Sequence, residues 1–227
     1  MLYGFSGVIL QGALVTLELA ISSVVLAVII GLIGAGGKLS QNRLSGRDFR
    51  KGTTTLIRGV PDLVLMLLIL LTVCQIALNT VTEAMGVGQI DIDPMVAGII
   101  TLGFIYGAYF TETFRGAFMA VPKGHIEAAT AFGFTRGQVF RRIMFPAMMR
   151  YALPGIGNNW LVILKSTALV SLLGLEDVVK ATQLAGKSTW EPFYFAIVCG
   201  VIYLVFTTVS NGVLLFLSAA TRGCEEG

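Results

Sequence analysis

The sequence predicts an all-α integral membrane protein, with five transmembrane helices forming a single membrane domain. The chain has 227 residues, of which 55% are hydrophobic and only 13% are charged, and its mean hydropathy is +0.82. Soluble domains carry roughly 25% charged residues. The charged residues of this chain gather between long apolar runs, which is the arrangement of a protein that crosses a bilayer several times.

Five runs are long and apolar enough to span a membrane as helices. They cover residues 7–33, 59–79, 95–114, 151–174 and 193–217. A helix needs about 20 mostly apolar residues to cross the hydrocarbon core, and a lone segment there can satisfy its backbone only as a helix. The first run lacks the basic start of a cleaved signal peptide, so we expect it to stay in the protein.

The charges of the four connections predict the orientation of the chain. Connections 34–58 and 115–150 each carry six basic residues against one acidic residue. Connection 80–94 carries only acidic charges, and connection 175–192 has three acidic residues against two basic ones. Because Lys and Arg concentrate in cytoplasmic loops, we expect the first and third connections inside, the N-terminus outside and the C-terminus inside.

The third connection contains the pattern of a helix, a break and a second helix. Pro122 suits a first helical turn, where its missing N–H is harmless, and Gly133 suits the left-handed residue that ends a helix. Thr135 and Gln138 have the spacing of a capping box that starts the second helix, and we expect Pro146 to end it. The connection therefore predicts a structured helical hairpin rather than a loose loop.

The residues of this hairpin leave two interpretations open. Its basic side chains are typical of a segment that rests on anionic lipid headgroups. Its small residues Ala128, Ala129 and Gly133 would instead let the surface of another protein approach closely, with the apolar faces filling a groove.

The same loop resembles the EAA signature of the membrane subunits of bacterial ABC importers. Phe145 stands where that signature usually has leucine. In this family the signature loop docks into a separate ATPase subunit, so the resemblance implies a role in ATPase coupling for the matching positions, Glu127, Ala128, Ala129, Gly133, Ile143 and Pro146.

Four further segments resemble the polar amino acid permeases of this family, and among them the permeases for histidine, lysine, arginine and ornithine. The segments are 12–17 (GALVTL), 58–63 (RGVPDL), 112–116 (ETFRG) and 164–169 (LKSTAL). The resemblance implies a type I ABC importer permease fold, with a core over about 12–215 of the domain 1–227. It also implies an amino acid importer driven by ATP in the bacterial inner membrane.

The resemblance also implies the partners of the chain. These are a second homologous permease, two ATPase subunits and periplasmic amino acid binding proteins, in addition to the lipid bilayer. ATP and Mg belong to the ATPase, and we expect this chain to bind no cofactor and no nucleic acid.

Polar groups within the predicted spans are candidates for the translocation pathway. Ionisable groups in a membrane are costly and are functional candidates. Glu18 has no partner nearby in the sequence, so it could either attract a cationic substrate or serve the structure. Asn158, Ser166 and Thr167 could equally contact a substrate or bond helices together.

Two other features of the spans have structural interpretations. Glu112 and Arg115 lie one helical turn apart, which favours a structural ion pair. Gly103 and Gly107 form a GxxxG pair that permits close helix approach.

The sequence gives little support for nucleotide binding, catalysis or metal binding. Residues 181–188 fit a relaxed phosphate-loop pattern, but they lie in an expected external connection rather than between a strand and a helix. His125 is the single histidine, and we expect it to be a polar loop residue. Without a base beside a nucleophile or a cluster of metal ligands, we expect a transport subunit that is not itself an enzyme and holds no metal.

Overall fold

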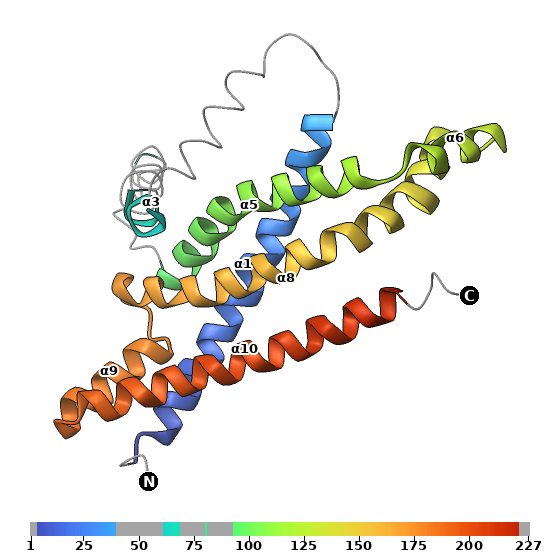
Figure 1. The fold of residues 1–227 in the computed structure, drawn as a ribbon. Helices are drawn as coiled ribbons and strands as arrows, with labels where there is room; N and C mark the ends of the chain where they lie inside the picture. The colour runs from blue at the N-terminus through green and yellow to red at the C-terminus, as the bar shows by residue number, and fades with distance from the viewer. Residues whose placement is uncertain (1–3, 40–60, 69–79, 81–92, 223–227) are drawn as a thin grey trace.

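Figure 1 shows the computed structural model, which describes residues 4–39, 61–68, 80 and 93–222. Every element in these ranges is helical, which confirms the all-α prediction for this part of the chain. The elements are α1 (Ser6–Leu39), α3 (Asp62–Leu68), α5 (Pro94–Ala120), α6 (Lys123–Ala131), α7 (Arg136–Val139), the π-helical turn η2 (Phe140–Met144), α8 (Phe145–Val170), the 3-10 turn η3 (Ser171–Leu173), α9 (Val178–Thr189) and α10 (Pro192–Arg222).

Four helical stretches of the described chain are long and apolar enough to cross a membrane. They are Ser6–Gly37, Pro94–Ala120, Arg136–Leu173 and Pro192–Ala219, and they contain the predicted first, third and fifth spans and all but the last residue of the fourth. Each is longer than predicted, since helices continue past the hydrocarbon core: the 27 residues of α5 extend about 40 Å. Of the predicted second span, 59–79, the structure describes only residues 61–68, which contain α3, and the rest lies outside the described residues.

The helix α5 lies at the centre of the fold and packs closely against α1. A Cβ added to Gly103 would lie 2.6 Å from the side chain of Leu26, and one added to Gly107 would lie 2.7 Å from that of Ile30. A side chain at either position would force Leu26, Ile30 or the helix itself to shift, because such distances are below van der Waals contact. The predicted GxxxG motif is therefore confirmed as a close-approach motif, and the helix that it meets is α1 of the same chain.

The main core lies where α5 meets α1 and α8. Phe110 and Phe114 of α5 are almost completely buried, as are Met148 and Ile163 of α8 and Leu19 of α1. A fully buried side chain of this kind contributes roughly 1.5–3 kcal/mol in water, but within a bilayer it is close packing that holds the helices together.

A second cluster joins the first turns of α1 to α9 and α10. Ile9 and Ala13 of α1 pack with Val178 and Ala185 of α9 and with Phe195 of α10. Connection 175–192 thus contains a helix, α9, which folds back beside the start of α10 (Figure 1). The helix α1 begins at this end of the molecule, whereas α10 ends toward the end that carries α6 (Figure 1).

Candidate functional site

The turn that ends α6 has the geometry predicted for it. Gly133 has a φ of +79°. Its N–H donates to the carbonyl of Thr130 at 3.0 Å, and the N–H of Phe134 donates to the carbonyl of Ala129 at 3.1 Å, which together form a Schellman motif. Nothing lies within 4 Å of a Cβ added to Gly133, so the backbone conformation, and not lack of space, is what favours glycine here.

The second helix of the hairpin begins at a capping box. Gln138 accepts a hydrogen bond from the backbone N–H of Thr135 at 2.9 Å, and the side chain of Thr135 accepts from the backbone of Gln138. The predicted capping box is confirmed, and it fixes the direction in which the chain leaves Gly133. Pro122 is the N-cap of α6, one position before the first helical turn in which it was predicted.

The prediction that Pro146 ends the second helix is wrong. The chain widens into the π-helical turn η2, where the N–H of Phe145 donates to the carbonyl of Phe140, five residues earlier. Proline lacks the N–H for an ordinary helical bond, and its ring would crowd the carbonyl of Arg142. The wider turn relieves this conflict, so Pro146 lies in the first turn of α8 and the hairpin, residues 122–144, continues directly into a candidate membrane span.

The hairpin presents some of its signature residues to solvent and hides one. Glu127, Ala128, Gly133 and Pro146 are exposed, and Ile143 is half-buried. Ala129 is only 3% exposed, so it cannot offer its surface to another protein as the sequence suggested. Its small side chain instead allows α6 to pack against the rest of the hairpin.

An exposed aromatic residue at the tip of the hairpin escaped the sequence interpretation. Phe132 is 84% exposed and directly precedes Gly133 at the end of α6. The sequence did contain a signal for this exposed residue: an aromatic side chain stands beside a helix-ending glycine in a loop with many polar residues.

Glu112 and Arg115 contact each other on α5, near the end that leads to the hairpin. Arg115 Nε donates to Glu112 Oε2 at 2.8 Å, and both side chains are partly exposed. Such pairs contribute only about 0.3–0.5 kcal/mol in water. This contact therefore neutralises two neighbouring charges on α5 and adds little to the stability of the fold.

The structure separates the predicted pathway residues into two groups. Ser166 lies 2.6 Å from the hydroxyl of Tyr106 on α5, and Thr167 lies 3.4 Å from the hydroxyl of Tyr203 on α10. Both are buried and join α8 to its neighbours. Asn158 is exposed on α8, and Glu18 is exposed on α1.

Asn158 lines a groove between α8 and α10. This hollow has a volume of about 500 Å³ and also contains Asn211 of α10. A neighbouring hollow of about 520 Å³ shares Asn211 and contains Lys165 and Thr207, so the two form one continuous groove along both helices. Polar and ionisable groups inside a membrane usually face a cavity or another protein segment rather than lipid. Glu18 lines neither hollow.

A buried carboxylate at the other end of the molecule was not singled out from the sequence. Asp177 is fully buried and caps α9, with Oδ1 accepting from the N–H of Lys180 at 2.9 Å. Oδ2 has no hydrogen-bond partner among the described residues. Burial raises the pKa of this carboxyl to about 6, because the charged form loses its water.

The backbone around Asp177 is held against α1. The N–H of Val178 donates to Thr16 Oγ1 at 3.1 Å, and a Cβ added to Gly12 would lie 2.8 Å from the carbonyl oxygen of Asp177. The cap of α9 and the first half of α1 therefore form one tightly fitted contact.

Comparisons with known proteins place these features in a family. The model of the family described as "Binding-protein-dependent transport system inner membrane component" matches residues 27–223. The chain is 94% identical over 217 residues to the "Histidine/lysine/arginine/ornithine transport system permease protein HisQ" of Escherichia coli (strain K12), which covers 96% of this chain and 94% of that protein. It is 38% identical over 172 residues to the "Arginine ABC transporter permease protein ArtQ" of the same organism, covering 70% of this chain and 72% of that protein.

A solved structure shares the fold. A chain of the crystal structure of an amino acid ABC transporter with histidines superposes with a TM-score of 0.77 and 27% identity, and the match covers 95% of both chains. A chain of the MetNI methionine ABC transporter, at 16% identity and a TM-score of 0.67, supports the fold alone.

The first prediction concerns Asp177. Burial raises the pKa of this carboxyl from 3.8 to about 6, so the folded protein holds its proton more tightly than the unfolded chain does. The free energy of unfolding is therefore highest below about pH 4, falls as the pH rises to about 6, and stays low above it. Asp177→Asn keeps the cap without the charge. Measured by thermal unfolding, we expect the free energy of unfolding at pH 7.5 to exceed that of wild type by up to about 3 kcal/mol, which corresponds to a shift of about two pKa units, with no gain near pH 4.

The control is Asp93→Asn at the exposed N-cap of α5, where Asp93 accepts from the N–H of Met95 at 2.8 Å. This variant should leave the difference between the two pH values unchanged. An Asp177→Asn protein that gains no stability at pH 7.5 would contradict the cost assigned to the buried charge.

Proposed function

Because the chain belongs to the family of binding-protein-dependent transport system inner membrane components, we propose that it is the permease subunit of an importer for histidine and the basic amino acids lysine, arginine and ornithine. The observation that carries this proposal is the 94% identity to a permease named for these four substrates, over 96% of the chain. The exposed hairpin supplies the means by which a permease without its own ATPase could be driven.

The importer has several further components. A separate ATPase, present in two copies, holds ATP and Mg, and periplasmic binding proteins deliver the amino acid. A second homologous permease covers the part of the groove between α8 and α10 that contains Asn158 and Lys165. The exposed positions of Asn158 and Lys165 support this, since both lie within a candidate span and polar groups there are costly against lipid.

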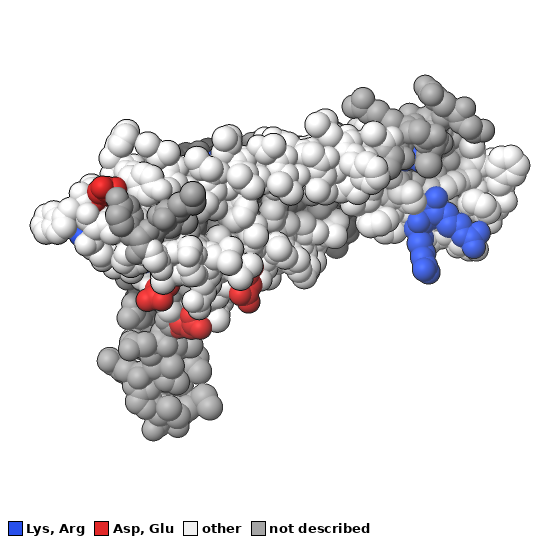
Figure 2. All heavy atoms as spheres, turned by 90° about the horizontal axis from the view of Figure 1, so that it is seen from below, with Lys and Arg blue, Asp and Glu red and all other residues white. Residues whose placement is uncertain are grey.

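The chain is one membrane domain over 1–227 with a core at about 12–215, and it spans the inner membrane five times, the second time over 59–79. The N-terminus lies outside and the C-terminus inside. Two observations support this orientation. The large basic patch in Figure 2 lies at the end of the molecule that carries α6, and the acidic side chains lie in the other half. The start of α1 lies toward the acidic end, and the end of α10 points toward the basic end (Figure 1).

The coupling hairpin transmits movement of the ATPase to the spans by two routes. One is the continuous chain through η2 into α8. The other is a ring contact between Phe140 of η2 and Phe118 of α5, whose centroids lie 6.1 Å apart at an interplanar angle of 24°. Closure of the ATPase dimer on ATP would therefore displace α5 and α8 together and open the groove toward the binding protein.

The signature residues have different roles in this coupling. Glu127, Ala128 and Gly133 form the exposed surface that docks into the ATPase, beside Phe132. Ala129 lets α6 pack within the hairpin. Ile143 and Pro146 form its junction with α8.

The second prediction concerns the docking surface. Gly133→Asp places a branched, charged side chain at a φ of +79° on the exposed tip. We expect the permease to fold but to lose at least tenfold in ATPase binding during co-purification, because the turn that shapes the surface is strained.

The matched control is Gly137→Asp, in the same hairpin. Gly137 also has nothing within 4 Å of an added Cβ and lies inside α7 without a positive φ. This variant should retain the ATPase. Undiminished ATPase binding and transport by the Gly133→Asp protein would refute the docking role.

The third prediction concerns Glu18, which we propose attracts cationic substrates. It is exposed on α1 within a candidate span, so its charge is available to the space beside that helix. We expect Glu18→Gln to lower arginine uptake severalfold and to affect uptake of the mostly neutral histidine less. Glu176→Gln, at an exposed acid in connection 175–192, is the control. Unchanged arginine transport in a normally assembled transporter would rule out this role.

A further inference from the structure

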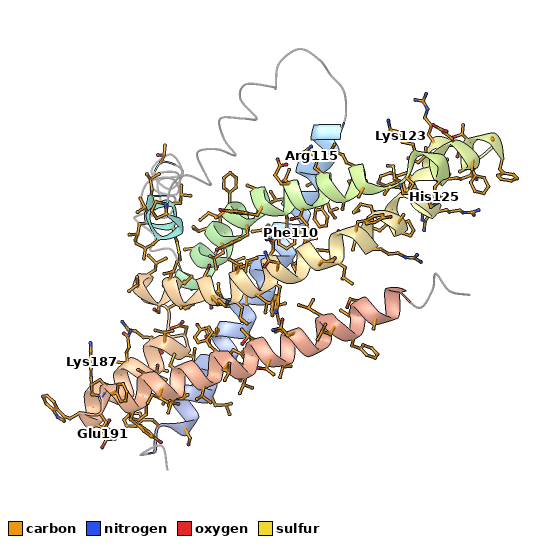
Figure 3. All side chains as sticks on the ribbon, viewed as in Figure 1. Phe110, Arg115, Lys123, His125, Lys187 and Glu191 are labelled. Atoms are coloured by element: carbon orange, nitrogen blue, oxygen red, sulfur yellow. The ribbon has the colours of Figure 1, made fainter. Side chains whose placement is uncertain are left out.

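A basic pocket lies where α6, α8 and α10 meet. It has a volume of about 390 Å³, and three basic residues line it: His125 at the start of α6, Arg142 in η2 and Arg150 in α8. His125 is at the hairpin end of the molecule, near the beginning of α8 (Figure 3). The hydroxyl-bearing residues Tyr151 and Ser218 also line the pocket.

The positive charge of this pocket is not neutralised by the part of the chain that the structure describes. No acidic residue lines the pocket. The ion pair of α5 uses Arg115 and Glu112, whereas Arg142 and Arg150 are both exposed. Two guanidinium groups and an imidazole around one hollow favour an anion, and guanidinium binds phosphate in a planar, two-pronged manner.

The composition of the lining distinguishes between kinds of anion. A free amino acid carries an ammonium group as well as a carboxylate, and this pocket presents no carboxylate to receive the ammonium. The ligand that fits is a phosphate ester without a positive charge. Hydroxyl groups on such a ligand could bond to Tyr151.

The apolar part of the pocket indicates an amphiphile. Ile143, Pro146, Leu153 and Pro154 continue the lining into the span. From Arg142 to Pro154 the chain advances about 18 Å along the helix, from charged residues to the apolar part of α8. Basic pockets at the cytoplasmic ends of membrane helices are a known setting for acidic headgroups.

We propose that this pocket binds an acidic phospholipid of the inner leaflet, with its phosphodiester held by Arg142 and Arg150 and its acyl chain along Leu153 and Pro154. The leaflet follows from the proposed orientation and thus rests on the proposed function. The lipid bridges the base of the coupling hairpin and α10, so it stabilises the junction through which the ATPase acts.

The test uses the complete transporter, purified in neutral detergent and stripped of lipid. Phosphatidylglycerol, phosphatidylcholine or inorganic phosphate is added, and bound lipid is counted by mass spectrometry of the intact complex alongside its thermal unfolding temperature. We expect phosphatidylglycerol alone to bind and to raise the unfolding temperature by several degrees. This readout requires no transport, so its failure is separable from failure of the proposed function.

The key variant is Arg142→Gln with Arg150→Gln, which should weaken phosphatidylglycerol binding at least tenfold. Its matched control, Arg136→Gln with Arg141→Gln, removes the same charge from exposed residues nearby that do not line the pocket, and it should bind as wild type does. Replacing Arg142 and Arg150 by lysine keeps the charge and should retain most of the binding, which separates loss of the site from loss of the fold.

Two results would overturn the proposal. One is equal binding of phosphatidylglycerol by the glutamine variant and the wild type. The other is the same stabilisation from inorganic phosphate alone, which would make the pocket a site for small anions rather than for lipid.

Discussion

The close packing of α1 against α5 is the constraint on which the rest of the structure depends. Glycine at 103 and 107 lets the two helices approach so closely that any larger residue there would force α1 or its side chains to shift. One face of α5 is thereby occupied, and its large residues, such as Phe110, complete the core with α8. Because α5 leads through a short turn into α6, this packing also fixes where the hairpin of residues 122–144 leaves the helical core.

The hairpin is rigid at its tip and attached at its base. Local bonds fix the tip: the Schellman turn at Gly133 and the capping box at Thr135 are both satisfied within the hairpin. The base is attached through η2 and through the contact of Phe118 with Phe140. A load applied at the tip therefore reaches two spans without an intervening flexible loop, as a mechanical coupling element requires. A π-helical turn at this junction is in keeping with the frequent occurrence of such turns at functional sites.

What could be predicted from the sequence was mostly local. Apolar run length predicts the spans, and the turn chemistry of Gly133 predicts the shape of the hairpin tip, because both depend on neighbouring residues. The prediction made from Pro146 was wrong, because proline ends a regular helix but can follow a π-helical turn. The burial of Ala129 and Asp177, and the presence of Asn158 and Asn211 in one groove, depend on which helices meet. A single sequence does not contain that information in any local pattern.

The most direct test of the central claim is a position-specific cross-link. A photoreactive amino acid at Phe132, on the exposed tip of the hairpin, is activated in the assembled transporter, and the covalent product is identified by mass spectrometry. The same probe at Trp190, which is 91% exposed near the start of α10, serves as the comparison. The account predicts that residue 132 is joined to the ATPase and that residue 190 is not. A probe at 132 that labels only lipid, or an ATPase joined at 190 instead, would contradict it.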